Sequence, residues 1–129
     1  MASELRLTTL ANNAGTESVD TTYVINGSAK AWNNMNGTGT AAIRDSFNIA
    51  SITDVGTAEY KHNLSNNMST ADSYSMTGFA RCSANAGFFG GIDNSVFTSG
   101  VIYHGTYGAG ATSAVDALYV TISVHGDLA

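Results

Sequence analysis

The sequence predicts an all-β protein, an antiparallel β-sandwich of jelly-roll-like form with an extended N-terminal arm and few or no helices. Three observations lead to this fold class. From Ala29 onward, apolar and polar residues alternate with a period of two, as in half-buried strands. No stretch keeps an apolar period of 3.6 residues between capping residues, so helices should be short or absent. Several short strands separated by turn residues are typical of a sandwich or barrel.

The expected strands lie at residues 29–36, 47–52, 59–64, 74–82 and 118–125, with one or two more around 96–97 and 101–103. In the first of them, Ala31, Asn33 and Met35 alternate with Trp32, and a turn signal follows at Asn36. The odd apolar step inside 47–52 indicates a bulge near residues 50–51. The last strand is apolar along one whole face, so we expect it at the centre of a sheet.

Length and composition bound the number of domains and the character of the surface. A chain of 129 residues, 43% of them hydrophobic, is long enough for one compact domain and short for two. Only 12% of the residues are charged, against about 25% in a typical soluble protein. We therefore expect one β-domain, residues 29–129, with a weakly charged surface that suits contacts with other subunits.

Residues 1–28 form the expected arm. Leu5, Leu7 and Leu10 are the main apolar residues before Val19, and small polar residues dominate between them. Such a segment cannot form a core alone, so it is either a flexible leader or an arm that orders on a partner.

Charge and cysteine content exclude several classes of protein. A net charge of -5 with only five Lys and Arg residues argues against nucleic acid as a partner. No apolar run reaches the roughly 18 residues needed for membrane insertion, and the N-terminus lacks the pattern of a signal peptide. Cys82 is the single cysteine, so neither an internal disulfide nor a cysteine-based zinc site is expected.

Catalytic signatures are weak, and we expect no enzyme, no metal and no cofactor. The carboxylates considered for a paired-acid site stand beside turn residues, where Asp commonly binds backbone N–H groups; they are Asp45, Asp54, Asp93 and Asp116. His62, His104 and His125 are too scattered for metal ligation by spacing. No Gly-x-Ser-x-Gly elbow is present.

One tryptophan and one adjacent charged pair are candidates for subunit contacts. Trp32 shares a polar strand face with Lys30, and an exposed indole there either stacks on a sugar or is buried by a partner chain. We favour the partner chain. Arg44 and Asp45 lie at a strand entrance, where such pairs more often make surface or intersubunit contacts than clamp a substrate.

A second group of residues has the composition of a carbohydrate site, with aromatic faces beside short hydrogen-bonding groups. Its members are Tyr103, His104, Tyr107, Asp93 and Asn94, all in a Gly-rich region expected to form one or two short strands joined by long loops. The alternative is that the aromatic residues only fill the space under a loop. For Tyr103, His104 and Tyr107 the two interpretations are evenly balanced.

Three segments resemble a known family. The run GSAKAWNNMNGTGTAAIRDSFNIASITDVGTAEYKHNL, residues 27–64, resembles a repeated module of bacteriophage tail-fibre and virion proteins. SELRLTTLANNAGT, residues 3–16, is similar to the leader of such proteins, and LYVTISVHGD, residues 118–127, to the closing strand of the module. The chain departs from the usual form at Asn33 and Met35, where Val and Phe are common, and at His125, where Phe is common.

The resemblance implies a virion structural protein, made in the host cytoplasm and assembled as a homotrimer. Leu5, Leu7 and Leu10 would then attach the leader to other tail or capsid proteins, and the β-domain would contribute to recognition of a host-surface glycan. Two alternatives stay open. A capsid decoration or head-fibre protein would bind the shell, and a glycan-cleaving enzyme, which we favour less, would degrade host polysaccharide.

Overall fold

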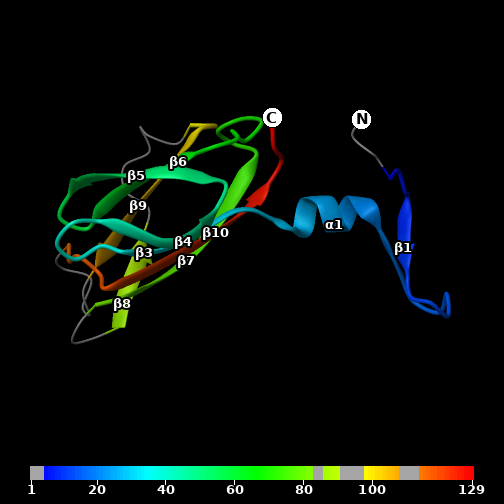
Figure 1. The fold of residues 1–129 in the computed structure, drawn as a ribbon, viewed down its shortest axis with the longest axis horizontal. Helices are drawn as coiled ribbons and strands as arrows, with labels where there is room; N and C mark the ends of the chain where they lie inside the picture. Colours follow the sequence, from blue (N-terminus) through cyan, green and yellow to red (C-terminus); the bar gives the residue numbers. More distant parts are fainter. Residues whose placement is uncertain (1–4, 83–85, 91–97, 108–113) are drawn as a thin grey trace.

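The molecule is elongated, with a β-sandwich at one end and a small N-terminal arm projecting from it (Figure 1). The computed structural model describes residues 5–82, 86–90, 98–107 and 114–129, with the backbone alone for residues 86–90 and 107. The arm holds β1 (Thr9–Ala11), β2 (Ser18–Asp20) and the single described helix, α1 (Thr21–Gly27). The sandwich holds β3 (Ala29–Asn36), β4 (Ala42–Phe47), β5 (Ile49–Gly56), β6 (Glu59–Leu64), β7 (Tyr74–Arg81), β8 (Ala86–Gly90), β9 (Val101–Tyr107) and β10 (Tyr119–Gly126).

The sandwich strands form two antiparallel layers, which strand β8 connects along one edge. Their order is β4-β3-β10-β7-β8-β9-β6-β5, and every neighbouring pair is antiparallel. Strand β8 pairs with both β7 and β9, so it joins the β4-β3-β10-β7 layer to the β9-β6-β5 layer. The prediction of an all-β antiparallel sandwich with an extended arm is confirmed.

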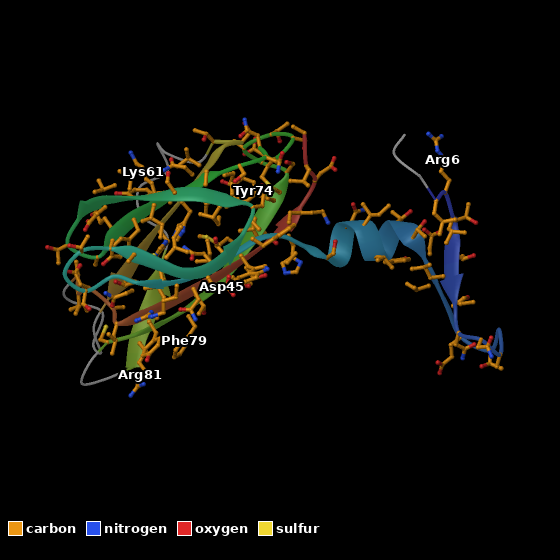
Figure 2. All side chains as sticks on the ribbon, viewed as in Figure 1. Arg6, Asp45, Lys61, Tyr74, Phe79 and Arg81 are labelled. Carbon is orange, nitrogen blue, oxygen red and sulfur yellow. The ribbon has the colours of Figure 1, made fainter. Side chains whose placement is uncertain are left out.

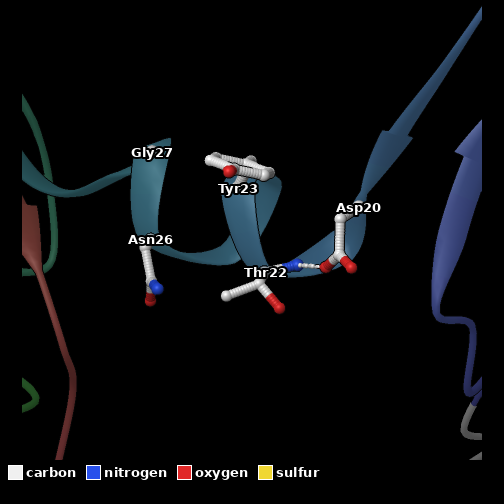
Figure 3. A pocket seen from close by; sticks show the side chains of 5 residues that line it. All are labelled: Asp20, Thr22, Tyr23, Asn26 and Gly27. Carbon is white, nitrogen blue, oxygen red and sulfur yellow. Dashed lines mark hydrogen bonds between the residues drawn. The ribbon is translucent and has the colours of Figure 1, made fainter.

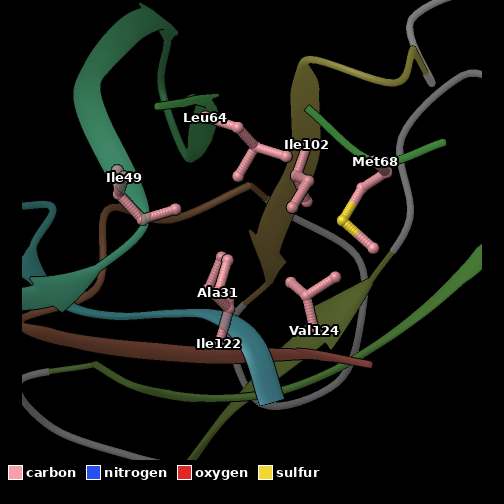
Figure 4. Close-up of a cluster of buried hydrophobic side chains, with 7 residues drawn as sticks. All are labelled: Ala31, Ile49, Leu64, Met68, Ile102, Ile122 and Val124. Atoms are coloured by element: carbon pink, nitrogen blue, oxygen red, sulfur yellow. The ribbon is translucent and has the colours of Figure 1, made fainter. Parts of the chain in front are cut away.

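Apolar side chains from both layers fill the space between them in two clusters. The first cluster, drawn in Figure 4, consists of Ala31, Ile49, Leu64, Met68, Ile102, Ile122 and Val124. The second consists of Met35, Tyr60, Ala80, Cys82, Ala117 and Val120. Met68, Cys82 and Ala117 lie outside the strands. The other members lie on strands, where successive residues point to opposite faces.

The strands with clear alternation are confirmed. The expected strand at 29–36 is β3, that at 59–64 is β6, that at 74–82 is β7, and the last strand is β10, between β3 and β7. The bulge expected near residues 50–51 appears as a register shift between Ile49 and Ser51. The strand expected around 101–103 is longer, β9, and residues 96–97 lie outside the described residues.

The single strand expected at 47–52 is wrong, because the chain turns a corner inside it. Asn48 has a φ of 57°, in the left-handed region that Asn tolerates better than most residues. Its amide nitrogen donates to the carbonyls of Lys30 and Asn66 at 3.0 Å, and its oxygen accepts from the Asn66 backbone at 2.7 Å. These bonds hold the corner that separates β4 in one layer from β5 in the other.

The arm has a hairpin and a helix that were not expected from its sequence. β1 and β2 pair as a hairpin, and Asp20 caps α1 by accepting a hydrogen bond from the Thr22 backbone at 2.7 Å. This bond also lowers the pKa of the Asp20 carboxyl below its usual 3.8. At the other end of α1, the carbonyl of Gly27 lies 3.0 Å from Nδ1 of His125 in β10. The arm is thereby joined to the sandwich beside β10.

Candidate binding surfaces

Exposed aromatic side chains gather on the outer face of the β4-β3-β10-β7 layer. Trp32, Phe47, Phe79 and Tyr119 all point away from the core, with exposed fractions between 36% and 56%. Strand register places them in order: Phe47 is opposite Trp32, and Phe79 is opposite Thr121. We call this surface the outer aromatic face. In Figure 2, Phe79 and Arg81 lie on this side of the sandwich, and Lys61 lies on the opposite side.

Two of the sequence candidates, Trp32 and Asp45, lie on the outer aromatic face, and Arg44 beside them holds its edge. The Arg44 guanidinium donates to the carbonyls of Met35 and Leu118 and lies 4.3 Å from the centre of the Tyr119 ring. It therefore ties β4 to the start of β10 within one chain. The expected role of these three residues in subunit contacts stays a prediction.

Lys30 lies elsewhere, at the junction between the arm and the sandwich. Its side chain is buried, and its ammonium donates to the carbonyls of Ile25 and Ser28 and to the Ser28 hydroxyl. A cation at this position satisfies carbonyls that the last turn of a helix leaves without partners. In the single chain Lys30 thus fixes α1 on the sandwich.

The residues expected in a glycan-binding loop do not form one surface among the described residues. Tyr103 lies on β9, in the strand expected around 101–103, His104 follows it on the same strand, and both are buried. Tyr103 donates to Oε2 of Glu59 at 2.7 Å, and its ring lies 5.6 Å from the Lys61 ammonium. His104 is fully buried between the layers, which agrees with the alternative that it fills space in the interior. Asp93, Asn94 and the Tyr107 side chain lie outside the described residues.

A chain of polar side chains crosses the core between the two apolar clusters. The Asn33 amide nitrogen lies 2.9 Å from Nδ1 of His62, and Nε2 of His62 lies 2.8 Å from Nδ1 of His104. The two imidazole rings are stacked with their centres 4.8 Å apart. This chain joins β3 in one layer to β6 and β9 in the other. The three residues are far apart in the sequence, and no motif links them.

Burial sets the protonation state of the two histidines, His62 and His104. Removal from water penalises an imidazolium, and it lowers the pKa of His62 from 6.5 to about 4. The pKa of His104 is lowered as well, first by burial and then by its proximity to His62. Both rings are therefore neutral near pH 7, and each can donate one hydrogen bond and accept another.

Tyr60 links the second apolar cluster to the loop after β3. Its hydroxyl lies 2.8 Å from the Gly37 carbonyl and 2.9 Å from Oδ1 of Asp116. The same carboxylate oxygen accepts from the Ala58 backbone at 2.7 Å. Burial, followed by the Asp116 hydrogen bond, raises the pKa of Tyr60, so the hydroxyl stays protonated as a donor. Asp116 thus serves the backbone and Tyr60, as expected for an Asp beside a turn.

The arm is a second candidate surface, since its apolar side chains have little cover. Thr21 is partly buried, and every other residue from 5 to 28 is exposed. The large apolar side chains left in water are Leu5, Leu7, Leu10, Val19, Tyr23, Val24 and Ile25. One groove lies between the hairpin and α1 and contains Leu7, Leu10, Val24 and Ile25. A second depression, lined by Tyr23 and Asn26 among others, lies on α1 itself (Figure 3).

The described residues contain neither a metal-binding cluster nor a membrane-spanning helix. No group of three or more His, Cys, Asp or Glu side chains there is arranged to hold a metal ion. Within the same residues, no helix has the length and apolar character needed to cross a membrane. Comparisons with protein-family models, with curated proteins and with solved structures find no match.

Proposed function

We propose that the chain is a structural protein of a bacteriophage virion, a tail-fibre-type module that assembles as a homotrimer and contributes to recognition of a host-surface glycan. The proposal rests on the resemblance of residues 27–64 to virion modules and on one structural observation. That observation is the arm: it projects from the sandwich, and no residue from 5 to 28 is buried. The arm joins copies of the chain to one another and to other virion proteins.

The energetics of the arm favour assembly. Full burial of a Val, Leu or Ile side chain contributes roughly 1.5–3 kcal/mol. Seven large apolar side chains of the arm are at least 40% exposed. Association costs an estimated 4–15 kcal/mol in lost freedom, and covering most of this surface gives a gain of comparable size. Only Arg6, Glu17 and Asp20 carry charge in residues 5–28, which keeps repulsion between arms small.

Antibody labelling of virions tests this proposal directly. We expect gold-labelled antibody against the sandwich to mark the tail tip of phage particles that carry the chain. Labelling spread over the shell would instead favour a capsid decoration or head-fibre protein, with the same arm clamping the shell. Absence of the chain from purified particles would contradict a virion role altogether.

The proposed role is binding without catalysis, and a separate assay tests that part. The full chain is incubated with host polysaccharide, and the release of reducing ends is measured over time. We expect no release above the rate of a heat-denatured control. Sustained release would assign the chain to the glycan-cleaving class.

A further inference from the structure

The geometry points to the outer aromatic face as the binding site for an oligosaccharide that carries a carboxylate. Two of its sugar rings stack on Trp32 and Phe79, and its carboxylate pairs with Arg81. This inference rests on the glycan-binding part of the proposed function and gives it a site and a ligand class. The site differs from the loop residues that the sequence suggested.

Strand register fixes the layout of the site. Across β3, β10 and β7, one row reads Trp32–Ser123–Thr77, and the next row on the same face reads Asn34–Thr121–Phe79. Trp32 and Phe79 therefore stand at diagonal corners. Strand spacing places their backbones about 12 Å apart, with two hydroxyl side chains between them. Such a separation suits successive or alternate rings of a linear oligosaccharide.

A shallow depression marks the centre of this layout. It is lined by Thr77, Gly78, Phe79, Thr121, Ile122 and Ser123. Its polar groups are hydroxyls, and none of these six side chains carries a charge. Among the described residues, the hydroxyls of Thr77 and Thr121 make no hydrogen bond to another side chain or to the backbone, while Ser123 Oγ lies 3.1 Å from Nε2 of His125.

Sugars match this combination of groups. A pyranose ring presents a flat C–H face that packs on an aromatic ring, and its edge carries hydroxyls that both donate and accept hydrogen bonds. Phe79 is 56% exposed and Trp32 is 36% exposed, so both rings can receive such a face. The hydroxyls and the Asn34 amide between them supply short, neutral hydrogen-bonding partners.

Charge identifies the ligand as acidic. Arg81 is two residues from Phe79 on the same face of β7, which separates their backbones by about 7 Å. Its guanidinium lies 5.8 Å from the centre of the Tyr119 ring and pairs with no carboxylate among the described residues. Arg44, by contrast, is already bonded to two carbonyls. Asp45, the carboxylate on the same face, lies on β4, three strands away from β7. Arg81 is therefore a local cation that can receive a planar carboxylate.

The dimensions of the face favour a small ligand over a second copy of the chain. Four strands and about seven residues along β10 give a face of roughly 19 Å by 23 Å, or about 450 Å². A stable protein interface buries about 800 Å² on each partner. The centre of the face is also lined by hydroxyls rather than by an apolar patch. A second copy seated on this face is the competing occupant.

A titration followed by NMR tests the inference on the full chain. The probes are sodium glucuronate and glucose, which share a pyranose ring and differ in the carboxylate. We expect saturable shifts in the backbone amides of residues 77–81 and 121–123 with both sugars. Glucuronate should bind about two- to fivefold more tightly, as befits an exposed ion pair worth up to about 1 kcal/mol.

Three variants separate the contributions. Phe79→Ala should weaken both sugars about tenfold, since a lost stacking contact is worth up to about 1.5 kcal/mol. Arg81→Gln should abolish the preference for glucuronate and leave the affinity for glucose unchanged. Lys61→Gln, a cation removed from the opposite face, is the matched control and should change neither.

Each contrary result overturns the inference in a recognisable way. Absence of saturable shifts on this face, or shifts confined to other residues, excludes the site. Shifts of the same amides on raising the protein concentration without sugar would show a second copy on the face. These results leave the virion labelling untouched, so failure of this inference is distinguishable from failure of the proposed function.

Discussion

At the scale of single residues, the central feature is the row of hydrogen-bonded polar side chains Asn33–His62–His104 inside a mostly apolar sandwich. The three residues come from both layers. The nitrogen atoms that join each residue to the next lie 2.8–2.9 Å apart. Buried polar groups are tolerated when they bond to one another, and a bonded chain also fixes how the layers face each other. The same burial makes the two histidines sensitive to acid.

Acid should destabilise the protein through these histidines. Their pKa values are lowered from 6.5 in the folded chain, so the unfolded chain binds protons more readily. The free energy of unfolding therefore has its full value above about pH 6.5. It falls as the pH drops toward 4, by up to ~1.4 kcal/mol per pH unit for each histidine. Urea unfolding between pH 7 and pH 5 measures this slope.

A pair of histidine variants shows which residue is responsible. His62→Gln keeps hydrogen-bonding capacity but removes one titrating group, so the slope between pH 7 and pH 5 should fall by about half. His104→Gln removes the other titrating group, so the slope should fall to a similar extent. A slope that stays unchanged in both variants would show that these rings are not the acid-sensitive groups.

The Tyr60 hydroxyl should make a measurable contribution to stability. Tyr60→Phe removes the hydroxyl that contacts Gly37 and Asp116 and leaves a carbonyl short of a donor in a buried place. We expect the free energy of unfolding to fall by about 1–2 kcal/mol, measured by urea denaturation. Tyr23→Phe removes an exposed hydroxyl and should have no effect. Equal stability of the two variants would contradict the account of Tyr60.

At the scale of elements, the loop after β3 is fixed by close packing on the neighbouring layer. A Cβ added at Gly37 would lie 2.5 Å from the Tyr60 hydroxyl oxygen and 3.0 Å from the Ala117 carbonyl. The Gly37 backbone also donates to that carbonyl at 2.9 Å. The loop therefore has no room for a side chain at this position.

Gly37→Ala should consequently destabilise the sandwich. We expect a loss of about 1–3 kcal/mol, the usual cost of overpacking, in thermal or urea unfolding. Gly56→Ala is the matched control, because a Cβ there meets nothing within 4 Å. A Gly37 variant as stable as the Gly56 variant would mean that the loop moves away from Tyr60 at little cost.

The elements that the sequence predicted well are those with one buried and one exposed face. In β6, Tyr60, His62 and Leu64 are buried and alternate with partly exposed residues. This alternation is visible in the sequence as a polarity pattern that repeats every two residues. Strand β4 was missed because it lies at a sheet edge and has no buried residue. In β9, residues 102–106 are buried without a break, so His104 showed no alternation and was taken for a loop residue.

The binding surface was predictable only in part. Alternation in 29–36 placed Trp32 on an outer face, and this position is confirmed. Its neighbours Ser123, Thr77 and Phe79 come from strands more than forty residues away, and only the sheet register brings them together. In the arm, α1 has no buried residue to create a period, although Asp20 as a capping residue was a signal that could have located its start.

At the scale of the whole molecule, the arm and the sandwich have different proposed roles. The arm carries the exposed apolar surface that the proposed assembly would cover, and the sandwich carries the outer aromatic face. Val24→Ser with Ile25→Ser removes two exposed side chains of α1 without touching the core. We expect this double variant to sediment as a smaller species with the same β-sheet circular dichroism. An unchanged oligomer would show that α1 is not part of the subunit contact.

The measurement that tests the central claim most directly is the mass of the full chain in dilute solution, by sedimentation equilibrium. The account predicts a species three times the 13.3 kDa of one chain, persisting on dilution. A folded species of 13.3 kDa at every concentration would contradict assembly as the role of the arm.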